Sequence, residues 1–168
     1  MLDSKMQKFL DFLDDAYRPR DEWAELKRRI IEKETGKQPR YFWIQFPAKT
    51  DTLPKVFEKQ ILELSKYNWF KQVTWNIEMH GEQTNHMHSH MIIENPKEQL
   101  RPARIIDQLS KHLGIPPNMI HCKRENHSFS NRLNYIKGLK VSPDKQILVE
   151  KDNQFREKNN LDIYYNAL

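Results

Sequence analysis

An alternation of polar and apolar residues runs through positions 73–93 and constrains the fold more than any other stretch. Trp75, Ile77, Met79, Met87 and Met91 are apolar and lie at odd positions, whereas Glu78, His80, His86, His88 and His90 lie at even positions. Alternate residues of a β-strand point to the same face. The central segment 81–85, Gly-Glu-Gln-Thr-Asn, has the composition of a turn. The sequence therefore predicts a β-hairpin with one apolar face and one polar face.

The polar face of this hairpin predicts a metal site. With the turn at 81–85, His80 lies opposite His86, and Glu78 lies opposite His88. Directly opposed side chains have Cβ atoms roughly 5 Å apart, so Glu78, His86 and His88 can converge on one ion. Mixed nitrogen and oxygen ligands suit Mg²⁺, Mn²⁺ or Zn²⁺. The alternative is a histidine-rich, solvent-exposed face on an ordinary hairpin.

The composition is that of a globular protein. The chain has 168 residues, of which 38% are hydrophobic and 30% are charged, enough for one domain with a real core. It has neither an 18-residue apolar run nor a basic-then-apolar leader, so we expect no membrane span, no signal peptide and an intracellular location. Its single cysteine excludes an internal disulfide. A net charge of +5 permits a nucleic-acid partner without requiring one.

Further elements are predicted from residue spacing along the chain. Helical periodicity covers 4–17, 21–35, 54–66, 101–113, 128–139 and 143–158, short strands are expected at 41–46 and 119–124, and the tail 159–168 is left open. From residue 40 this order predicts an α+β fold, an antiparallel sheet of about five strands with helices packed on one face. Residues 1–38 then form an N-terminal helical extension, and residues 39–168 form the main domain.

The spacing Glu78-x-His80, Gly81 and His86-Met87-His88 resembles the metal motif of the HUH endonuclease domain. The version it resembles is that of replication initiator (Rep) proteins of circular single-stranded DNA viruses and related plasmids. There, two histidines flank a hydrophobic residue, and a glutamate on the neighbouring strand completes the site. The element order over 40–158 also resembles that family's sheet, an RRM-like palm. The resemblance implies Mn²⁺ or Mg²⁺ as cofactor and a single-stranded origin stem-loop as partner.

The resemblance also implies a nucleophilic tyrosine on the helix after the fourth strand, which is the position of Tyr135. Tyr135 lies roughly 200° round the helix from Leu133, a member of its apolar stripe, so we expect the phenol to point away from the core. A half-buried packing tyrosine is the alternative. Tyr164 and Tyr165, in the tail, are weaker candidates for the nucleophile.

The viral pattern commonly has a lysine three residues after the tyrosine, where this chain has Gly138. The nearby lysines, Lys137 and Lys140, are not on the helix face of Tyr135. We therefore expect both to support the reaction only partially.

Residues for binding the DNA strand are less specific in the sequence. Single-stranded DNA binds to stacking rings and to cations, and the candidates are Trp43, Arg101, Arg104, Lys123, Arg124 and Arg132. For each of these residues, the alternative to DNA binding is a role in packing or a position on the solvent-exposed surface. His80 and His90 would orient the metal ligands or donate to phosphate, or else lie on a solvated face. Asp152 is expected to be an acid on a helix surface.

The function expected from these features is that of an endonuclease that nicks single-stranded origin DNA in rolling-circle replication. Attack by Tyr135 would give a 5′-phosphotyrosine link and a free 3′-hydroxyl, and the same site would rejoin strands. The host nucleus and the cytoplasm are not distinguished. One alternative is a metal-dependent nuclease or hydrolase without a covalent step. Another is a module that binds RNA or single-stranded DNA without catalysis.

Overall fold

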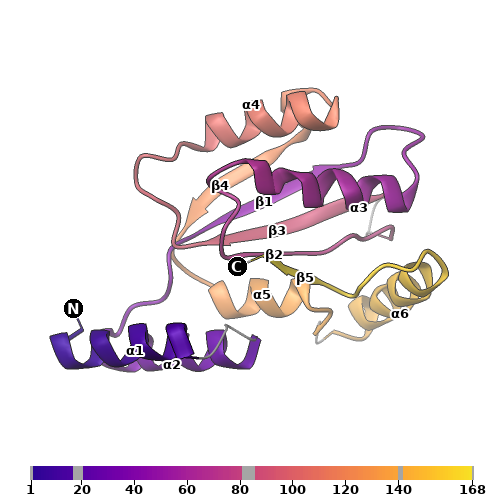
Figure 1. Cartoon of the computed structure of the whole chain (residues 1–168). Helices are drawn as coiled ribbons and strands as arrows, with labels where there is room; N and C mark the ends of the chain where they lie inside the picture. The colour runs from indigo at the N-terminus through magenta and orange to yellow at the C-terminus, as the bar shows by residue number, and fades with distance from the viewer. Residues whose placement is uncertain (1, 17–20, 81–85, 140–141, 168) are drawn as a thin grey trace. The chain divides into compact units, whose positions relative to one another are not determined.

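The computed structural model describes residues 2–16, 21–80, 86–139 and 142–167 (Figure 1). The chain divides into two compact units, residues 1–39 and 40–167. The first unit contains α1 (Ser4–Ala16) and α2 (Asp21–Thr35). The second contains β1 (Tyr41–Pro47), α3 (Pro54–Leu62), the 3₁₀ helix η1 (Glu63–Lys66), β2 (Val73–Trp75), β3 (His88–Glu94), α4 (Pro102–Leu113), the 3₁₀ helix η2 (Pro117–Met119), β4 (His121–Glu125), α5 (Phe129–Ile136), α6 (Pro143–Lys158) and β5 (Tyr165–Ala167).

The five strands form one antiparallel sheet in the order β4-β1-β3-β2-β5. This confirms the α+β class and the five-stranded sheet expected from the sequence. β5 lies in the tail that the sequence left open, and it pairs with β2. β1 and β3 are neighbours near the middle of the sheet, so residues of β3 have a paired strand on each side.

Helices cover both faces of the sheet, which corrects the expectation of helices on one face. α3 and α4 lie over one face, and α5 lies over the other (Figure 1). The burial of β1 shows why helices are needed on both faces. Phe42 and Ile44 are buried in the core beneath α3 and α4, whereas Tyr41 and Trp43 are buried against α5. A strand that is buried on both faces has a continuous apolar sequence rather than an alternating one.

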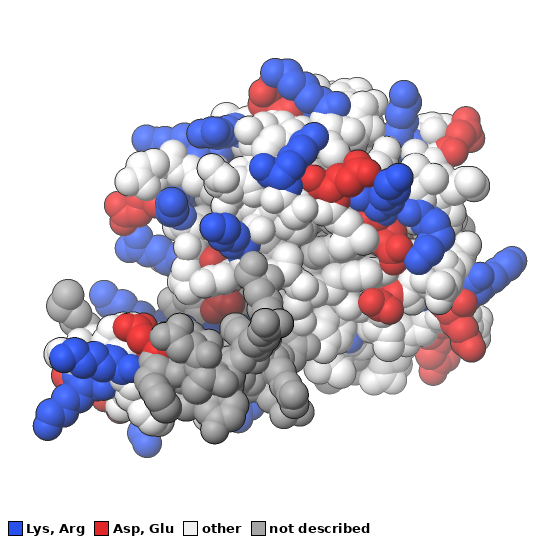
Figure 2. All heavy atoms as spheres, viewed as in Figure 1, with Lys and Arg blue, Asp and Glu red and all other residues white. Residues whose placement is uncertain are grey.

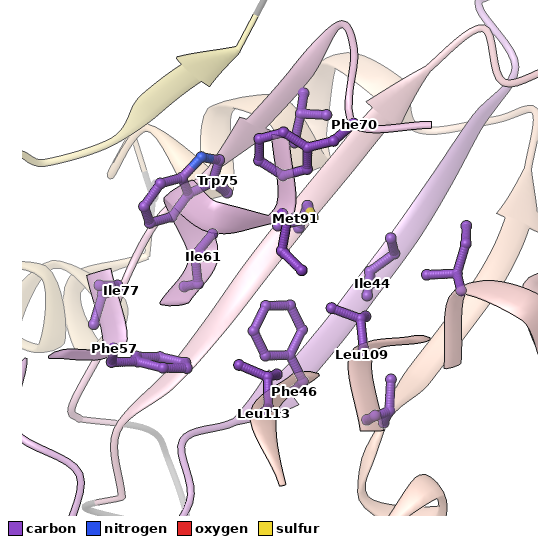
Figure 3. Close-up of a cluster of buried hydrophobic side chains, with 14 of the residues drawn as sticks. Ile44, Phe46, Phe57, Ile61, Phe70, Trp75, Ile77, Met91, Leu109 and Leu113 are labelled. Carbon is purple, nitrogen blue, oxygen red and sulfur yellow. The ribbon is translucent and has the colours of Figure 1, made fainter. Parts of the chain in front are cut away.

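The larger core lies between the sheet and helices α3 and α4 (Figure 3). Each helix turns an i, i+4 pair toward the sheet, Phe57 with Ile61 in α3 and Leu109 with Leu113 in α4. They surround Met91 of β3, which is fully buried. Burial of each such side chain contributes roughly 1.5–3 kcal/mol, so this core fixes the position of β3.

The hairpin at 73–93 has the predicted register. Trp75 pairs with Met91, and Glu78 forms an isolated bridge with His88. The odd-numbered side chains Trp75, Ile77, Met87 and Met91 are buried in the larger core, and Met79 packs against it. The even-numbered side chains therefore face α5. The turn expected at 81–85 lies outside the described residues.

Two elements near this face begin or end differently from the prediction. α5 ends at Ile136 because Gly138 follows in a left-handed conformation, with φ +79°. The N–H of Leu139 donates to the carbonyl of Asn134 and closes the helix end (2.9 Å). β4 begins at His121 because the prolines before it form η2.

The surface carries charges of both signs. Figure 2 shows Lys and Arg side chains interspersed with Asp and Glu over the face in view. Of the helices in the described ranges, none combines the length and the apolar character that a membrane span requires.

Candidate metal centre

Three side chains on the α5 face of the hairpin bring metal-ligating atoms together: Glu78, His88 and His90. Oε2 of Glu78 lies 3.2 Å from Nε2 of His88 and 3.2 Å from Nε2 of His90. The three ligand atoms all lie within 4.8 Å of one another. Glu78 follows β2, and the two histidines occupy successive positions on one face of β3. The hairpin register therefore places these three residues on one face, and we call them the metal group.

The spacing of the metal group fits one cation. Nitrogen and oxygen ligands lie about 2.0–2.2 Å from a divalent ion, so neighbouring ligands of one ion are roughly 3–3.5 Å apart. Both separations of 3.2 Å fall in that range. One carboxylate and two imidazoles also leave coordination positions for water or for a substrate oxygen. The metal group could therefore bind a metal ion.

The hydrogen bonds of His88 support this reading. Its Nδ1 lies 2.8 Å from the carbonyl oxygen of His86, and a carbonyl only accepts, so Nδ1 carries a hydrogen. In the neutral ring Nε2 is then an acceptor, and it faces an acceptor oxygen of Glu78. Two acceptors at this distance need either a proton or a metal cation between them.

In the absence of metal, the surroundings of His88 favour a proton in that place. Burial lowers the pKa of the His88 imidazole, but hydrogen bonds to Glu78 and to the His86 carbonyl, with the negative charges of Glu78 and Asp152, outweigh burial and raise its pKa above the ordinary value. A metal ion and a proton therefore compete for Nε2.

We expect this competition to make the stabilising effect of metal depend on pH. The raised pKa of His88 stabilises the metal-free protein fully below the unfolded-state value of about 6.5. That contribution is lost as the pH rises through the folded-state pKa. Metal affinity rises over the same interval because Nε2 loses its proton. Thermal unfolding in EDTA and in Mn²⁺ should show a metal-induced increase in Tm that grows as the pH rises from about 6.5 through the folded-state pKa of His88.

The variant His88→Gln is the control, because it lacks the titrating ring. Its Tm should respond little to Mn²⁺ at any pH in this interval. A metal-induced increase in Tm that is the same at every pH in the wild-type protein would contradict the proposed competition.

Asn76, which the sequence did not single out, joins the metal group to α5. Its fully buried amide Nδ2 donates to Oε1 of Glu78 and to the carbonyl of Ile136, both at 3.1 Å. Its Oδ1 accepts the N–H of His90 at 3.2 Å. Asn76 thereby fixes the Glu78 carboxylate and ties it to the residue next to Tyr135. The only signal in the sequence was an amide at an even position of the hairpin.

Asp152 is buried, which corrects its expected place on a helix surface. Only 1% of Asp152 is exposed. Its Oδ1 accepts the N–H of Met79 (3.0 Å), the N–H of His80 (2.9 Å) and Nδ1–H of His80 (3.0 Å). α6 thus anchors the chain directly after Glu78. The charged neighbours of Asp152 on α6 concealed this role, because its partners are distant in sequence.

Replacing Asp152 with alanine is expected to lower both stability and metal affinity. The change leaves three donors without their acceptor, and loss of a buried charged acceptor costs at least about 2 kcal/mol. Mn²⁺ affinity should fall as well because Glu78 loses its anchor. Denaturant unfolding and calorimetry measure the two effects. Glu150→Ala, which removes an exposed acid of the same helix, should change the free energy of unfolding by less than about 0.5 kcal/mol. Equal effects of the two substitutions would contradict the anchoring role.

His86 does not join the metal group, so the ligand set differs from the one expected from the sequence. His86 and His90 are both two residues from His88, and strand alternation alone cannot choose between them. Nε2 of His86 donates instead to the carbonyl of Ala48 (2.9 Å). The amide of Asn76, which is hydrogen-bonded to the His90 backbone, holds the Glu78 carboxylate on the His90 side.

α5 brings Tyr135 next to the metal group. The ring centroid of Tyr135 lies 5.0 Å from that of His90 and 6.3 Å from that of Trp43, with an interplanar angle of 75° in both pairs. The ring is half-buried and packs against the cluster that contains Trp43 and Ile92. Tyr135 therefore faces the sheet at the metal group as a half-buried packing residue, which was the alternative considered from the sequence, and it does not point away from the core as the helix stripe predicted.

Tyr165 is held on the other side of the sheet. Its ring stacks on Trp75, with centroids 4.0 Å apart, and its hydroxyl donates to a carboxylate oxygen of Glu58 in α3. Burial and this hydrogen bond raise the pKa of Tyr165. These contacts disfavour Tyr165 as a nucleophile.

Of the two candidate lysines that follow Tyr135, the structure describes only Lys137. Nζ of Lys137 lies 5.3 Å from the ring centroid of Tyr164, and Tyr164 packs against the same cluster as Tyr135. Lys140 lies outside the described residues.

Three of the basic residues considered for DNA binding belong to the α4 side of the sheet, opposite the metal group. Arg101 and Arg104 are exposed at the start of α4. The Arg124 guanidinium lies 4.5 Å from the ring centroid of Phe42 and donates to the carbonyl of Leu100 (2.8 Å). Arg124 therefore has a structural role. The remaining candidates, Trp43, Lys123 and Arg132, lie around β1, β4 and α5.

Comparison with known proteins adds no relative. No family model matches the chain, and no curated protein and no solved structure matches it either.

Proposed function

We propose that the protein is an endonuclease and strand transferase that acts on single-stranded DNA through Tyr135, with Mn²⁺ or Mg²⁺ bound by Glu78, His88 and His90. The observation that carries the proposal is the 5.0 Å contact between the rings of Tyr135 and His90. A phenol beside a metal-binding group is the pairing that this reaction needs. The proposed biological role is initiation of rolling-circle replication.

The resemblance to the HUH domain of Rep proteins supports the proposal, with a second departure in addition to Gly138 in place of the lysine. The two histidines that meet Glu78 flank Ser89, where the family has a hydrophobic residue. Ser89 is fully buried on the core side of β3. It therefore occupies the position of the apolar residue, although it is a polar one.

In the proposed reaction, Tyr135 Oη attacks the phosphorus of one phosphodiester in line with the bond to the 3′-oxygen. That bond breaks, the 3′-oxygen takes up a proton, and the 5′-phosphate becomes an ester of tyrosine. The bound divalent ion would neutralise a non-bridging oxygen of the phosphate. Attack by a 3′-hydroxyl on the phosphotyrosine reverses the step and rejoins strands, because one phosphodiester is exchanged for another.

The residues of the chain prepare this step in two ways. A phenol has a pKa near 10, and a divalent ion held by Glu78, His88 and His90 would favour the phenolate form of Tyr135. Asn76 links the Glu78 carboxylate to the carbonyl of Ile136, the residue after the nucleophile. This link holds metal ligand and nucleophile in one rigid unit.

The test uses the whole chain with Mn²⁺ and a library of fluorescent single-stranded oligonucleotides that includes stem-loops. A denaturing gel and intact-protein mass spectrometry should detect protein that carries a DNA fragment, with Tyr135 as the modified residue. Cleavage products without any adduct would instead identify a hydrolase. A shift on a native gel without cleavage would identify a binding module.

A metal-dependent hydrolase is the second candidate function, and the His80–Asp152 pair favours it. Nδ1–H of His80 donates to the buried carboxylate of Asp152 at 3.0 Å, which leaves Nε2 as the basic nitrogen of the ring. A histidine supported in this way accepts protons from water or from a hydroxyl. The same gel distinguishes it, because hydrolysis leaves no covalent adduct.

A further inference from the structure

Arg132 shares a face of α5 with Tyr135. The two residues are three positions apart, so their Cβ atoms are about 5–6 Å from each other. Both contact the same indole. The Arg132 guanidinium carbon lies 4.8 Å from the ring centroid of Trp43, and the Tyr135 ring lies 6.3 Å from it. The Trp43 ring lies in turn 5.4 Å from that of His90. Arg132 is therefore connected to the metal group through one aromatic ring.

The described residues do not use all the hydrogen-bonding capacity of Arg132. Its Nη2 lies 3.5 Å from Oε1 of Glu125, which is longer than the usual charge-assisted bond of about 2.7–2.9 Å. Its Nη1 is buried, and no acceptor among the described residues reaches it. The side chain is 30% exposed. Arg132 is therefore not fully hydrogen-bonded, and a ligand can reach the exposed part of its side chain.

The charges around Arg132 favour an anionic ligand. The buried carboxylate of Glu125 lies 3.5 Å from Arg132, 3.8 Å from Nζ of Lys123 and 3.2 Å from Nε2 of His127. One negative charge therefore faces two permanent positive charges and a histidine. Glu125 holds the guanidinium over Trp43 but cannot neutralise the whole cluster, so a net positive charge remains.

We propose that Arg132 and Trp43 form a subsite for a phosphate group of a single-stranded nucleic acid, next to Tyr135. The planar fork of a guanidinium matches two oxygens of a phosphate. The indole holds the guanidinium in place through a cation–π contact, and the exposed part of the side chain remains open to the ligand. The position of this phosphate relative to the scissile one rests on the proposed function, whereas its binding does not. Arg132 donates hydrogen bonds only, and no proton or bond is transferred at this residue.

The first experiment measures binding without chemistry. Fluorescence anisotropy with a short single-stranded oligonucleotide in EDTA compares the wild-type protein with Arg132→Gln, Arg132→Lys and Lys111→Gln. Lys111 is the matched control for charge, because its 76% exposed side chain lies on α4 across the sheet. We expect Arg132→Gln to weaken binding about tenfold and to reduce the salt slope by about one unit. Arg132→Lys should bind with intermediate affinity because it keeps the charge but loses the fork. Lys111→Gln should change affinity less than about twofold.

Circular dichroism and Mn²⁺ calorimetry establish that each variant is folded. If Arg132→Gln does not fold, the affinity of Arg132→Lys tests the subsite instead. Wild-type affinity in Arg132→Lys would overturn the proposed subsite. Absence of binding by the wild-type protein, or equal binding by Arg132→Gln, also overturns it.

Adduct formation is measured separately, so that the two proposals can fail independently. If the wild-type protein forms the tyrosine adduct and Arg132→Gln matches it in both rate and affinity, the subsite is refuted and the proposed function stands. If binding depends on Arg132 but no adduct forms, the subsite stands and the tyrosine-dependent function is refuted.

Discussion

Replacing His90 with alanine is expected to abolish Mn²⁺ binding and, with it, DNA cleavage. His90 provides one of the three ligand atoms, and its Nε2 lies 3.2 Å from the Glu78 carboxylate. Residues that only orient a metal ligand contribute about 10–100-fold in affinity, so loss of a ligand should cost more than about 100-fold. Calorimetry should find about one site per wild-type chain and no measurable site in His90→Ala. His88→Ala should behave in the same way.

His86→Ala is the matched control, because it removes an imidazole that lies two residues before His88. The ring of His86 is bonded to the Ala48 carbonyl, so we expect Mn²⁺ affinity to change by less than about tenfold. The opposite outcome, with His86→Ala losing the metal and His90→Ala retaining it, would restore the ligand set expected from the sequence. Wild-type affinity in both variants would place the metal elsewhere.

The hairpin register could be predicted from the sequence because two local signals agree. Strand alternation places Trp75 and Met91 on one face, and turn composition at 81–85 fixes which residues are opposed. The bridge between Glu78 and His88 follows from these two facts. A shift of one residue would have moved every histidine into the core, so the register was strongly determined.

The choice of His90 over His86 could not be predicted, because it depends on contacts between distant segments. Asn76 turns the Glu78 carboxylate, and Ala48 accepts the His86 ring. The burial of Asp152 is of the same kind, since its partners are Met79 and His80 on another element. Periodicity reports which face a residue occupies and says nothing about hydrogen-bond partners across that face.

The position of α5 on the second face of the sheet could not be predicted, for a different reason. The segment Tyr41–Pro47 is apolar at nearly every position, and such a short run does not distinguish a strand buried on both faces from one with an aromatic surface. The consequence for the site is large. Only because α5 covers the second face does Tyr135 meet His90.

Replacing Tyr135 with phenylalanine is expected to remove the covalent adduct while leaving the fold and the metal group intact. The substitution deletes only the phenol oxygen, so the ring retains its contacts with Trp43 and His90. The free energy of unfolding should change by no more than about 0.5–1.5 kcal/mol. Mn²⁺ affinity should stay near that of the wild type because all three ligand atoms remain. Denaturant unfolding, calorimetry and a denaturing gel measure these quantities on one preparation.

Tyr164→Phe is the matched control, because Tyr164 packs against the same aromatic cluster. It should form adduct as the wild-type protein does, and adduct that persists in Tyr135→Phe but vanishes in Tyr164→Phe would reassign the nucleophile. Cleavage by Tyr135→Phe without any adduct would instead mean that water attacks the phosphate. The His80–Asp152 pair would then be the first place to look for the base, and His80→Gln should slow that residual cleavage.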